Sequence, residues 1–326
     1  MKKYKAMFVC ARPENIGRVY DEAQRKTLSE ITEMFSEIVT PANFDSFDLT
    51  DREVIFSTWG MMNFTDEQLS RLPRLEAVFY GAGATDTFAR PLLKRNIKIM
   101  SAWKANAVPV AEFTAAQIVL SMKNYFSNTW ENRFVGPGCY GEKVALLGAG
   151  AISKKVQELL KNYRLEVMVV PSRPEHRTVS LEEAFRTAYV VSNHLPDRED
   201  NQKVITKAMF ESMRHGATFI NTGRGRQVDE EGMIQVLKKR PDLTALLDVL
   251  TQEPPQADSE LRTLPNVRLS SHIAGSLNDE LRRMSEFVIE DFRRFAQGEP
   301  MLYEIREEML LTSGNAAPSG GTGKGK

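Results

Sequence analysis

The stretch Val144-Ala-Leu-Leu-Gly148-Ala-Gly150-Ala-Ile-Ser153 indicates the fold class, because an apolar strand runs directly into a glycine pair and then into a helical segment. Gly148 permits a tight turn, and Gly150 lets the backbone approach a pyrophosphate that rests on the helix N-terminus. Ser153 occupies a third small position, where glycine or alanine is usual. The stretch predicts a dinucleotide-binding turn, and the alternative is a glycine-rich turn that holds no ligand.

Strands and helices alternate on both sides of this turn. The second half of the chain predicts buried strands at residues 144–147, 166–170, 189–193, 218–221, 245–248 and 267–269. The first hundred residues predict strands at 6–10, 37–39, 54–57, 77–80 and 97–100. Helices are expected at 22–35, 86–95, 111–126 and 278–297, and a capping box at 65–68 opens a short one. We therefore expect an α/β protein with two doubly wound parallel sheets.

The composition limits the class of protein. A chain of 326 residues fits two domains, and its 43 Lys and Arg balance 43 Asp and Glu, so no net charge favours nucleic acid or an anionic membrane. Cys10 and Cys139 stand far apart, which argues against a disulfide or a metal site and favours the cytoplasm. No apolar run is long enough to span a membrane, so we expect a soluble protein. Residues 313–326 predict a disordered tail.

The residues after the second strand of this half indicate which nicotinamide cofactor binds. A site for NAD usually carries Asp or Glu about 20 residues beyond the glycine turn, where it holds the ribose 2′-hydroxyl. The sequence there reads Val170-Pro171-Ser172-Arg173, without an acid. Ser172 can hydrogen-bond a 2′-phosphate and Arg173 can pair with it, which favours NADP(H) and leaves NAD possible. The alternative is that Arg173 is a solvated loop charge.

Polar side chains follow three further predicted strands. Arg224 lies beyond the strand at 218–221, Asp248 and Glu253 lie at the end of the strand at 245–248, and His272 follows the strand at 267–269. In an open α/β sheet, ligands bind at the carboxyl ends of the strands. We therefore expect these four side chains at one edge of the sheet.

The chemistry of these groups is complementary. Arg224 supplies a guanidinium fork for a substrate carboxylate, and His272 is suited to donate a proton near neutral pH. Glu253 beside the imidazole stabilises its protonated form. Each residue alone has a structural alternative, such as a buried histidine or a loop glutamate before proline. Their order after a dinucleotide-binding turn favours the reduction of a keto acid by a nicotinamide cofactor.

These segments resemble the D-isomer-specific 2-hydroxyacid dehydrogenases, most strongly over residues 102–298. The motifs that carry the resemblance are 148–150, Asn193-His194-Leu-Pro196, 220–225, Val228-Asp-Glu, Asp248-Val with Glu253-Pro, and 272–275. The resemblance implies that Arg224, Glu253 and His272 are catalytic, with Arg224 on the substrate carboxylate and carbonyl and His272 as the acid/base. It also implies that Ala82, Gly83, Arg224 and His272 bind the substrate. Pro171 stands where NAD-dependent members usually have Asp.

The expected cofactor-binding residues come from the glycine turn, the phosphate position and the later strand ends, and the resemblance adds further positions such as Thr114 and Asp248. They are Thr114, Gly148, Ala149, Gly150, Ala151, Ile152, Ser172, Arg173, His194, Pro196, Thr222, Gly223, Arg224, Asp248, His272, Ala274 and Gly275.

The resemblance further implies a domain organisation and a range of substrates. Residues 1–102 and 298–312 are expected to form a discontinuous, flavodoxin-like substrate domain, and 103–297 a Rossmann cofactor domain. A homodimer and a small 2-keto acid of the glyoxylate or hydroxypyruvate type are expected. The alternative is a relative of the corepressor type, which senses the cofactor and binds partners without turnover.

Overall fold

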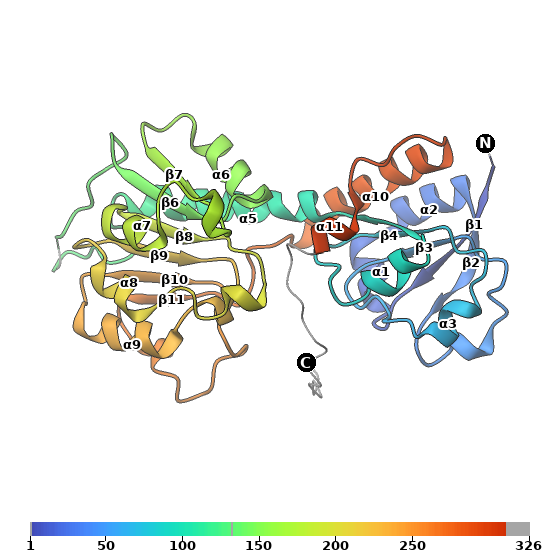
Figure 1. Cartoon of the computed structure of the whole chain (residues 1–326), viewed down its shortest axis with the longest axis horizontal. Coiled ribbons are helices and arrows are strands. Elements are labelled where there is room, and N and C mark those ends of the chain that lie inside the picture. The colour runs from blue at the N-terminus through green and yellow to red at the C-terminus, as the bar shows by residue number, and fades with distance from the viewer. Residues whose placement is uncertain (1, 132, 311–326) are drawn as a thin grey trace. The chain divides into compact units, whose positions relative to one another are not determined.

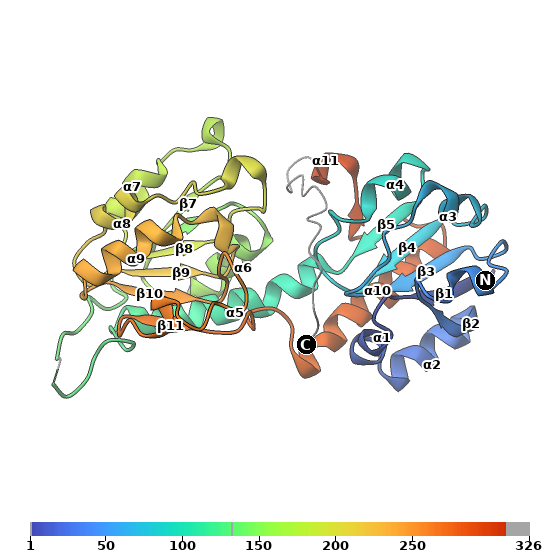
Figure 2. The ribbon, with the colours of Figure 1, turned by 90° about the horizontal axis from the view of Figure 1, so that it is seen from below.

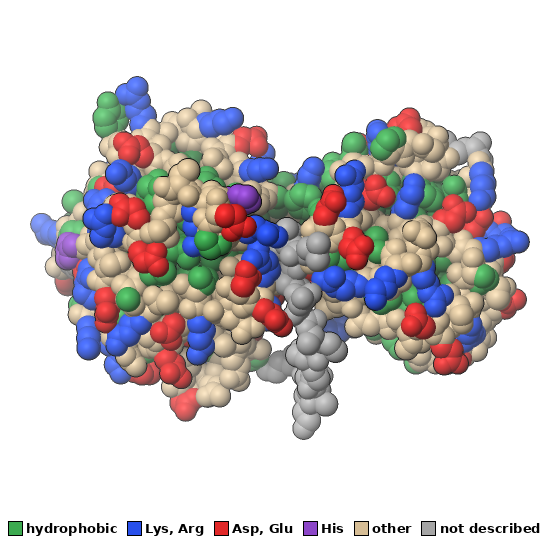
Figure 3. Space-filling model, in the orientation of Figure 1, with side chains coloured by type: hydrophobic (Ala, Val, Ile, Leu, Met, Phe, Trp, Pro, Cys, Tyr) green, Lys and Arg blue, Asp and Glu red, His purple; other side chains and the backbone are tan. Residues whose placement is uncertain are grey.

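The computed structural model describes residues 2–131 and 133–310, which belong to two compact units (Figure 1). The first unit comprises Met1–Asn106 with Leu277–Lys326, and the second comprises Ala107–Ser276. Basic and acidic side chains are interspersed over the visible face of each unit (Figure 3). Among the described residues, no helix is long and apolar enough to cross a membrane, and no group of three His, Cys, Asp or Glu side chains is placed to hold a metal ion.

The first unit contains a six-stranded sheet in the order β12-β5-β4-β3-β1-β2. All neighbouring pairs are parallel except β12 with β5. The order places β1 between β2 and β3, so the direction of winding reverses at β1, which makes this a flavodoxin-like sheet. The strands are β1 (Tyr4–Val9), β2 (Thr32–Val39), β3 (Val54–Ser57), β4 (Ala77–Tyr80), β5 (Lys98–Ser101) and β12 (Glu304–Ile305).

Helices cover both faces of this sheet (Figure 2). One face packs against α1 (Glu14–Val19), α2 (Glu22–Ile31) and α10 (Leu281–Ala296), which follows the short turn η6 (Asn278–Glu280). The other face packs against α3 (Asp66–Ser70), α4 (Ala89–Lys94), α11 (Glu307–Leu310) and the turn η1 (Phe44–Ser46). The strands are buried on both faces, which explains why they read as continuous apolar runs rather than as alternating patterns.

The second unit contains a six-stranded parallel sheet in the order β11-β10-β9-β8-β6-β7. Its strands are β6 (Lys143–Leu147), β7 (Glu166–Val170), β8 (Val190–Asn193), β9 (Thr218–Asn221), β10 (Thr244–Leu247) and β11 (Val267–Leu269). One face packs against α5 (Trp103–Ser121) and α6 (Ala151–Leu160), and the other against α7 (Leu181–Thr187), α8 (Lys207–Ser212) and α9 (Glu230–Lys239). Short turns η2 (Pro174–His176), η3 (Glu199–Asn201), η4 (Gly225–Gln227) and η5 (Glu260–Arg262) complete it.

The predicted fold class is confirmed: both sheets are doubly wound and covered by helices on two faces. β3, β4, β7, β9 and β11 have the predicted bounds. The capping box of α3 also forms, because Thr65 Oγ1 accepts from the Gln68 N–H at 3.1 Å and Gln68 Oε1 accepts from the Thr65 N–H at 3.0 Å.

All four predicted helices differ from the structure at their ends: α4 and α10 differ by three residues or fewer at each end, and the other two differ by more. The helix predicted at 22–35 ends at Ile31, where the Thr32 hydroxyl donates to Leu28 O at 2.6 Å, and residues 32–35 belong to β2. The helix predicted at 111–126 begins at Trp103 and ends at Ser121, with Pro109 in its interior. Ala105 and Ala107 before Pro109 and Ala111 after it are buried, so packing supports the helix on both sides of the proline.

The division into units differs from the predicted domain boundaries at α10. The prediction placed residues 277–297 in the cofactor domain, whereas α10 belongs to the first unit. Its apolar face, which includes Met284, Val288 and Phe292, is buried against that unit's sheet. Asp291 of α10 accepts hydrogen bonds from the N–H groups of Leu302 and Tyr303 at 2.7 and 2.8 Å. These bonds hold the helix to the residues directly before β12. The tail predicted at 313–326 lies outside the described residues.

Candidate active site

The glycine turn lies at the carboxyl end of β6, beside β7 and β8, where the direction of winding reverses. Gly148 has φ of +106°, its N–H donates to Val170 O at 2.7 Å, and a Cβ built on it would lie 2.4 Å from His194 O. A Cβ on Gly150, by contrast, would meet nothing within 4 Å. Gly148 is therefore required by the fold itself, whereas the space beside Gly150 is open to a ligand.

The N-terminus of α6 supplies the donors for that ligand. Gly150 is the N-cap and no side chain caps the helix. Lys154 is the first residue whose N–H finds an acceptor, Gly150 O at 3.1 Å. The N–H groups of Ala149, Ala151 and Ile152 donate to no described residue. Unsatisfied N–H groups at a helix start bind phosphate, so this turn fits the pyrophosphate of a dinucleotide.

Three arginines surround the end of β7. Arg177 donates to Pro171 O at 2.8 Å and to Ser172 O at 2.6 Å, and Arg198 donates to Ser172 Oγ at 3.3 Å. Arg173 lies 3.8 Å from Glu175, and Arg198 pairs with Asp200. Sequence reasoning named Ser172 and Arg173 but missed Arg198, which follows β8 and carries no local motif. The cluster offers hydrogen-bond donors to an anion.

A buried chain of polar groups runs behind the turn. Thr114 and Thr222 lie 3.3 Å apart between their hydroxyls, Thr222 Oγ1 lies 3.4 Å from His194 Nδ1, and His194 Nε2 lies 2.9 Å from Ser192 Oγ. Burial lowers the pKa of His194 to about 3, so its imidazole is neutral at physiological pH. The structure thus brings Thr114, Thr222 and His194 together in the second unit.

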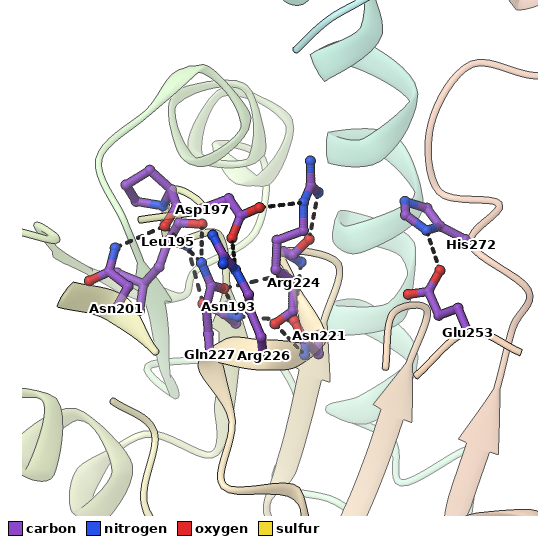
Figure 4. Close-up of polar contacts among 12 residues, drawn as sticks. Asn193, Leu195, Asp197, Asn201, Asn221, Arg224, Arg226, Gln227, Glu253 and His272 are labelled. Atoms are coloured by element: carbon purple, nitrogen blue, oxygen red, sulfur yellow. Dashed lines mark hydrogen bonds and ion pairs between the residues drawn. The ribbon is translucent and has the colours of Figure 1, made fainter. Parts of the chain in front are cut away.

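Three buried amides shape the loop that carries Arg224 (Figure 4). Asn193 Nδ2 donates to Asn221 Oδ1 at 3.0 Å and to Gln227 Oε1 at 2.7 Å, and Gln227 Oε1 also accepts the Arg224 N–H at 3.2 Å. Gln227 Nε2 in turn donates to the carbonyls of Leu195 and Pro196. Sequence reasoning missed Gln227, since a lone glutamine in a loop gives no signal. Because every amide atom of Gln227 is bonded, the network holds the loop rigidly.

The guanidinium of Arg224 is only partly engaged. Its Nη1 donates to Gly223 O at 2.8 Å, and its Nε lies 3.7 Å from Asp197 Oδ2. Asp197 also pairs with Arg226. The Nη2 atom has no partner among the described residues. The Arg224–Asp197 pair is solvent-accessible and long, so it is weak and leaves Arg224 able to bind an anion.

His272 lies on a turn that is held by hydrogen bonds to Asp248. The buried Asp248 carboxylate accepts the Ser270 hydroxyl at 2.5 Å and the N–H groups of Ile273 and Ala274 at 2.8 and 2.9 Å. Asp248 O also accepts the His272 N–H at 3.0 Å. His272 has φ of +59°, a left-handed conformation that such a hydrogen-bonded turn supports. Gly275 follows Ala274 directly on the same turn.

Glu253 orients the imidazole of His272. Glu253 Oε2 lies 2.7 Å from His272 Nδ1, and Glu253 Oε1 accepts the Leu250 N–H at 3.0 Å (Figure 4). A carboxylate only accepts, so Nδ1 carries a proton in this pair. Nε2 has no partner among the described residues and remains available. The pair holds the imidazole in one orientation and leaves Nε2 open, which are the conditions that proton transfer by a histidine requires.

The remaining predicted residues lie in the first unit. Ala82 and Gly83 follow β4, at the same edge as the end of β5. Ala82 is buried and Gly83 half-buried. Their N–H groups donate to no described residue, which is consistent with a site for an anion.

Comparison with known proteins identifies the lineage. The family model for the D-isomer specific 2-hydroxyacid dehydrogenase NAD binding domain matches residues 113–274. YoaD of Bacillus subtilis (strain 168) is 28% identical over 233 residues, which cover 65% of this chain and 68% of that protein. A glyoxylate reductase of Korarchaeum cryptofilum (strain OPF8) is 27% identical over 265 residues, 75% of this chain and 80% of that protein. Matches to longer D-3-phosphoglycerate dehydrogenases span 38% to 45% of those proteins.

The fold is shared with solved structures. A phosphoglycerate oxidoreductase from Rhizobium etli superimposes with a TM-score of 0.78 at 20% identity, covering 95% of this chain and 100% of that chain. The matched family segment contains the glycine turn, Arg224, Glu253 and His272. The chain therefore belongs to the D-isomer specific 2-hydroxyacid dehydrogenase family, NAD(P)-dependent oxidoreductases that act on CH–OH groups.

Proposed function

We propose that this chain reduces small 2-keto acids of the glyoxylate and hydroxypyruvate type to D-2-hydroxy acids, and that it favours NADPH. The observation that carries the proposal is the pair of His272 and Glu253, 2.7 Å apart, with Nε2 of the imidazole left without a described partner. The likeness to a glyoxylate reductase, at 27% identity, supports the choice of a small keto acid.

In this proposal the residues of the chain bind the substrate and move one proton. A bound nicotinamide cofactor supplies the hydride that reaches the carbonyl carbon. His272 gives the proton on Nε2 to the carbonyl oxygen as negative charge develops there, and Glu253 stabilises the imidazolium until then. Arg224 and the N–H groups of Ala82 and Gly83 bind the substrate carboxylate. The cofactor would lie on the glycine turn, Thr114, Thr222 and the residues near Asp248.

The preference for NADPH rests on the end of β7. Ser172, Arg173, Arg177 and Arg198 gather there, and no acid stands where a ribose 2′-hydroxyl is usually held. A phosphate dianion bound by arginines gains charge-assisted hydrogen bonds that a hydroxyl lacks. Asp200 and Glu175 already pair with two of these arginines, which moderates the gain.

The function is tested by following the oxidation of NADPH and NADH in the presence of glyoxylate, hydroxypyruvate, pyruvate, phenylpyruvate and 2-ketoisocaproate. We expect turnover, faster with NADPH and best with a small acid. Replacing Ser172 with Asp should lower kcat/KM for NADPH about 100-fold, because a carboxylate repels the 2′-phosphate, and should spare NADH. Arg186→Ala, which removes an exposed arginine from α7 of the same unit, is the matched control. Absence of turnover across the panel would contradict the function, and equal use of both cofactors would contradict the preference.

We also propose that the second unit mediates a homodimer. The segment 122–142, which joins α5 to β6 (Figure 1), carries four apolar side chains that are largely in solvent: Tyr125, Trp130, Val135 and Tyr140, 65 to 85% exposed. An apolar groove between α5 and α6, lined by Val119, Leu120, Leu159 and Tyr163, lies in the same unit. In a two-fold dimer, the same surface of both copies forms the interface. We propose that segment 122–142 and the groove between α5 and α6 are covered by these same surfaces of a second copy.

Sedimentation velocity tests the dimer. The mass derived from sedimentation of the unmodified chain should be twice the chain mass of 36.8 kDa. The double variant Tyr125→Ser, Trp130→Ser should have the mass of a single chain. Leu302→Ser, which removes an exposed apolar side chain from the first unit, should leave the dimer intact. A monomer at every concentration of the unmodified chain would rule the dimer out.

A further inference from the structure

Three consecutive carbonyls after β4 are held by two buried hydroxyls. Thr58 Oγ1 donates to Gly81 O at 2.9 Å. Ser101 Oγ lies 2.8 Å from Ala82 O and 2.7 Å from Gly83 O, so its single proton is shared between them. Thr58 and Ser101 are both fully buried, and they come from the ends of the two strands that flank β4. The carbonyl side of this loop is therefore fixed from within the first unit.

Fixing these carbonyls also fixes the N–H groups of the next residues. In a trans peptide the C=O and the following N–H lie in one plane and point in opposite directions. The carbonyls of residues 81, 82 and 83 therefore set the directions of the N–H groups of Ala82, Gly83 and Ala84. These three N–H groups donate to no described residue. Ala82 is buried and Gly83 half-buried, whereas Ala84 is exposed. A buried donor without a partner is costly, which indicates that the N–H groups of Ala82 and Gly83 serve a ligand.

We propose that Ser101, together with Thr58, is a positioning residue that aims the N–H groups of residues 82–84 at the carboxylate of the substrate. The inference rests on the proposed function. Ser101 touches no reacting atom; it acts through the peptide planes that its hydroxyl orients. Without that hydroxyl, the carbonyls of Ala82 and Gly83 lose the side-chain donor that Ser101 gives them, and the two peptide planes can turn. The carboxylate would then meet misdirected donors, while the keto carbonyl and the proton donor stay as they were.

Ser57 provides a matched control. It is fully buried, as Ser101 is, and it ends the neighbouring strand β3. Its hydroxyl donates to Val9 O at 2.5 Å, on the side of the sheet away from β4. Ser57→Ala therefore removes a buried hydroxyl from the same sheet without touching the carbonyls of the loop. Thr58→Ser retains the hydroxyl that Thr58→Val removes, which separates the hydrogen bond from packing.

The experiment compares two substrates that differ only in the carboxylate: the best 2-keto acid and its 2-keto amide, with saturating NADPH. Ser101→Ala should lower kcat/KM for the keto acid about 10-fold, largely through KM, and leave kcat/KM for the amide within about twofold. Thr58→Val should act in the same direction, with Thr58→Ser restoring the unmodified ratio. Ser57→Ala should leave the ratio of acid to amide unchanged. Melting temperatures establish that each variant is folded, and Thr58→Val replaces Ser101→Ala if the latter is not.

The outcomes separate the inference from the proposed function. If the unmodified enzyme reduces the keto acid and the ratio of acid to amide is the same in Ser101→Ala and Thr58→Val, the positioning role is overturned while the function stands. A loss of turnover that is equal for acid and amide also overturns it, because that pattern is structural damage. If the unmodified enzyme reduces neither compound, the proposed function and the inference fall together.

Discussion

Replacing His272 with alanine should lower kcat for the reduction of a 2-keto acid about 10²- to 10⁴-fold, the usual contribution of a general acid. The developing alkoxide would have to take its proton from water, because in the proposed mechanism the donor is Nε2 of His272, whose ring Glu253 and the Asp248 turn hold in place. The affinity for NADPH should change far less than kcat, since the glycine turn proposed to hold the pyrophosphate keeps every backbone contact. Steady-state kinetics and a fluorescence titration of NADPH measure the two quantities.

Two variants make this result specific. Glu253→Gln retains the hydrogen bond to Nδ1 but removes the negative charge. It should therefore lower kcat about 10- to 100-fold, less than His272→Ala does. His215→Ala is the matched control, because His215 is an exposed histidine of the same unit that pairs with Asp242 at 3.1 Å. Turnover that survives in His272→Ala would assign the proton to another group, and a loss in His215→Ala of the same size would point to a general loss of folded enzyme.

The parts of the site that sequence predicts well are those with local signals. The glycine turn, Arg224 and His272 each follow a short apolar run, and a buried parallel strand places whatever follows it at the carboxyl edge of the sheet. β9 and β11 end where the sequence predicts, so the structure brings Arg224 and His272 to the ends of strands in one sheet (Figure 4). Their assignment to catalysis remains a prediction, because geometry alone does not measure a rate.

The parts that sequence does not predict are long-range contacts. Gln227 reaches Asn193 across 34 residues, and Arg198 reaches Ser172 across 26. Ser101 reaches the carbonyls of Ala82 and Gly83 across an intervening helix. No spacing in the sequence predicts such pairs. The order of strands in the sheet sets the neighbours of each loop, and that order is a property of the tertiary structure. The placement of α10 is of the same kind, since its amphipathic pattern predicts a buried face without saying which sheet covers it.

Alanine at Gly150 and alanine at Gly148 should affect different properties: the first should weaken cofactor binding, and the second should lower stability. Gly150→Ala places a Cβ where nothing lies within 4 Å, in the space open to a pyrophosphate. We expect the dissociation constant of NADPH to rise about 100-fold, because the backbone can no longer approach the phosphate. The melting temperature of the cofactor-free protein should change by no more than about 3 °C, since the poorer N-cap and the lower entropy of the unfolded chain offset each other.

Gly148→Ala is the counterpart, because here the fold and not the ligand requires glycine. The residue has φ of +106°, and a Cβ would lie 2.4 Å from His194 O. The strain and the overlap together should cost about 2–4 kcal/mol and lower the melting temperature by about 5–10 °C before any cofactor is added. Thermal melts and NADPH titrations of both variants separate the two roles. If Gly150→Ala binds NADPH as tightly as the unmodified protein, the pyrophosphate does not lie on this turn, and the cofactor site must be sought at another edge of the sheet.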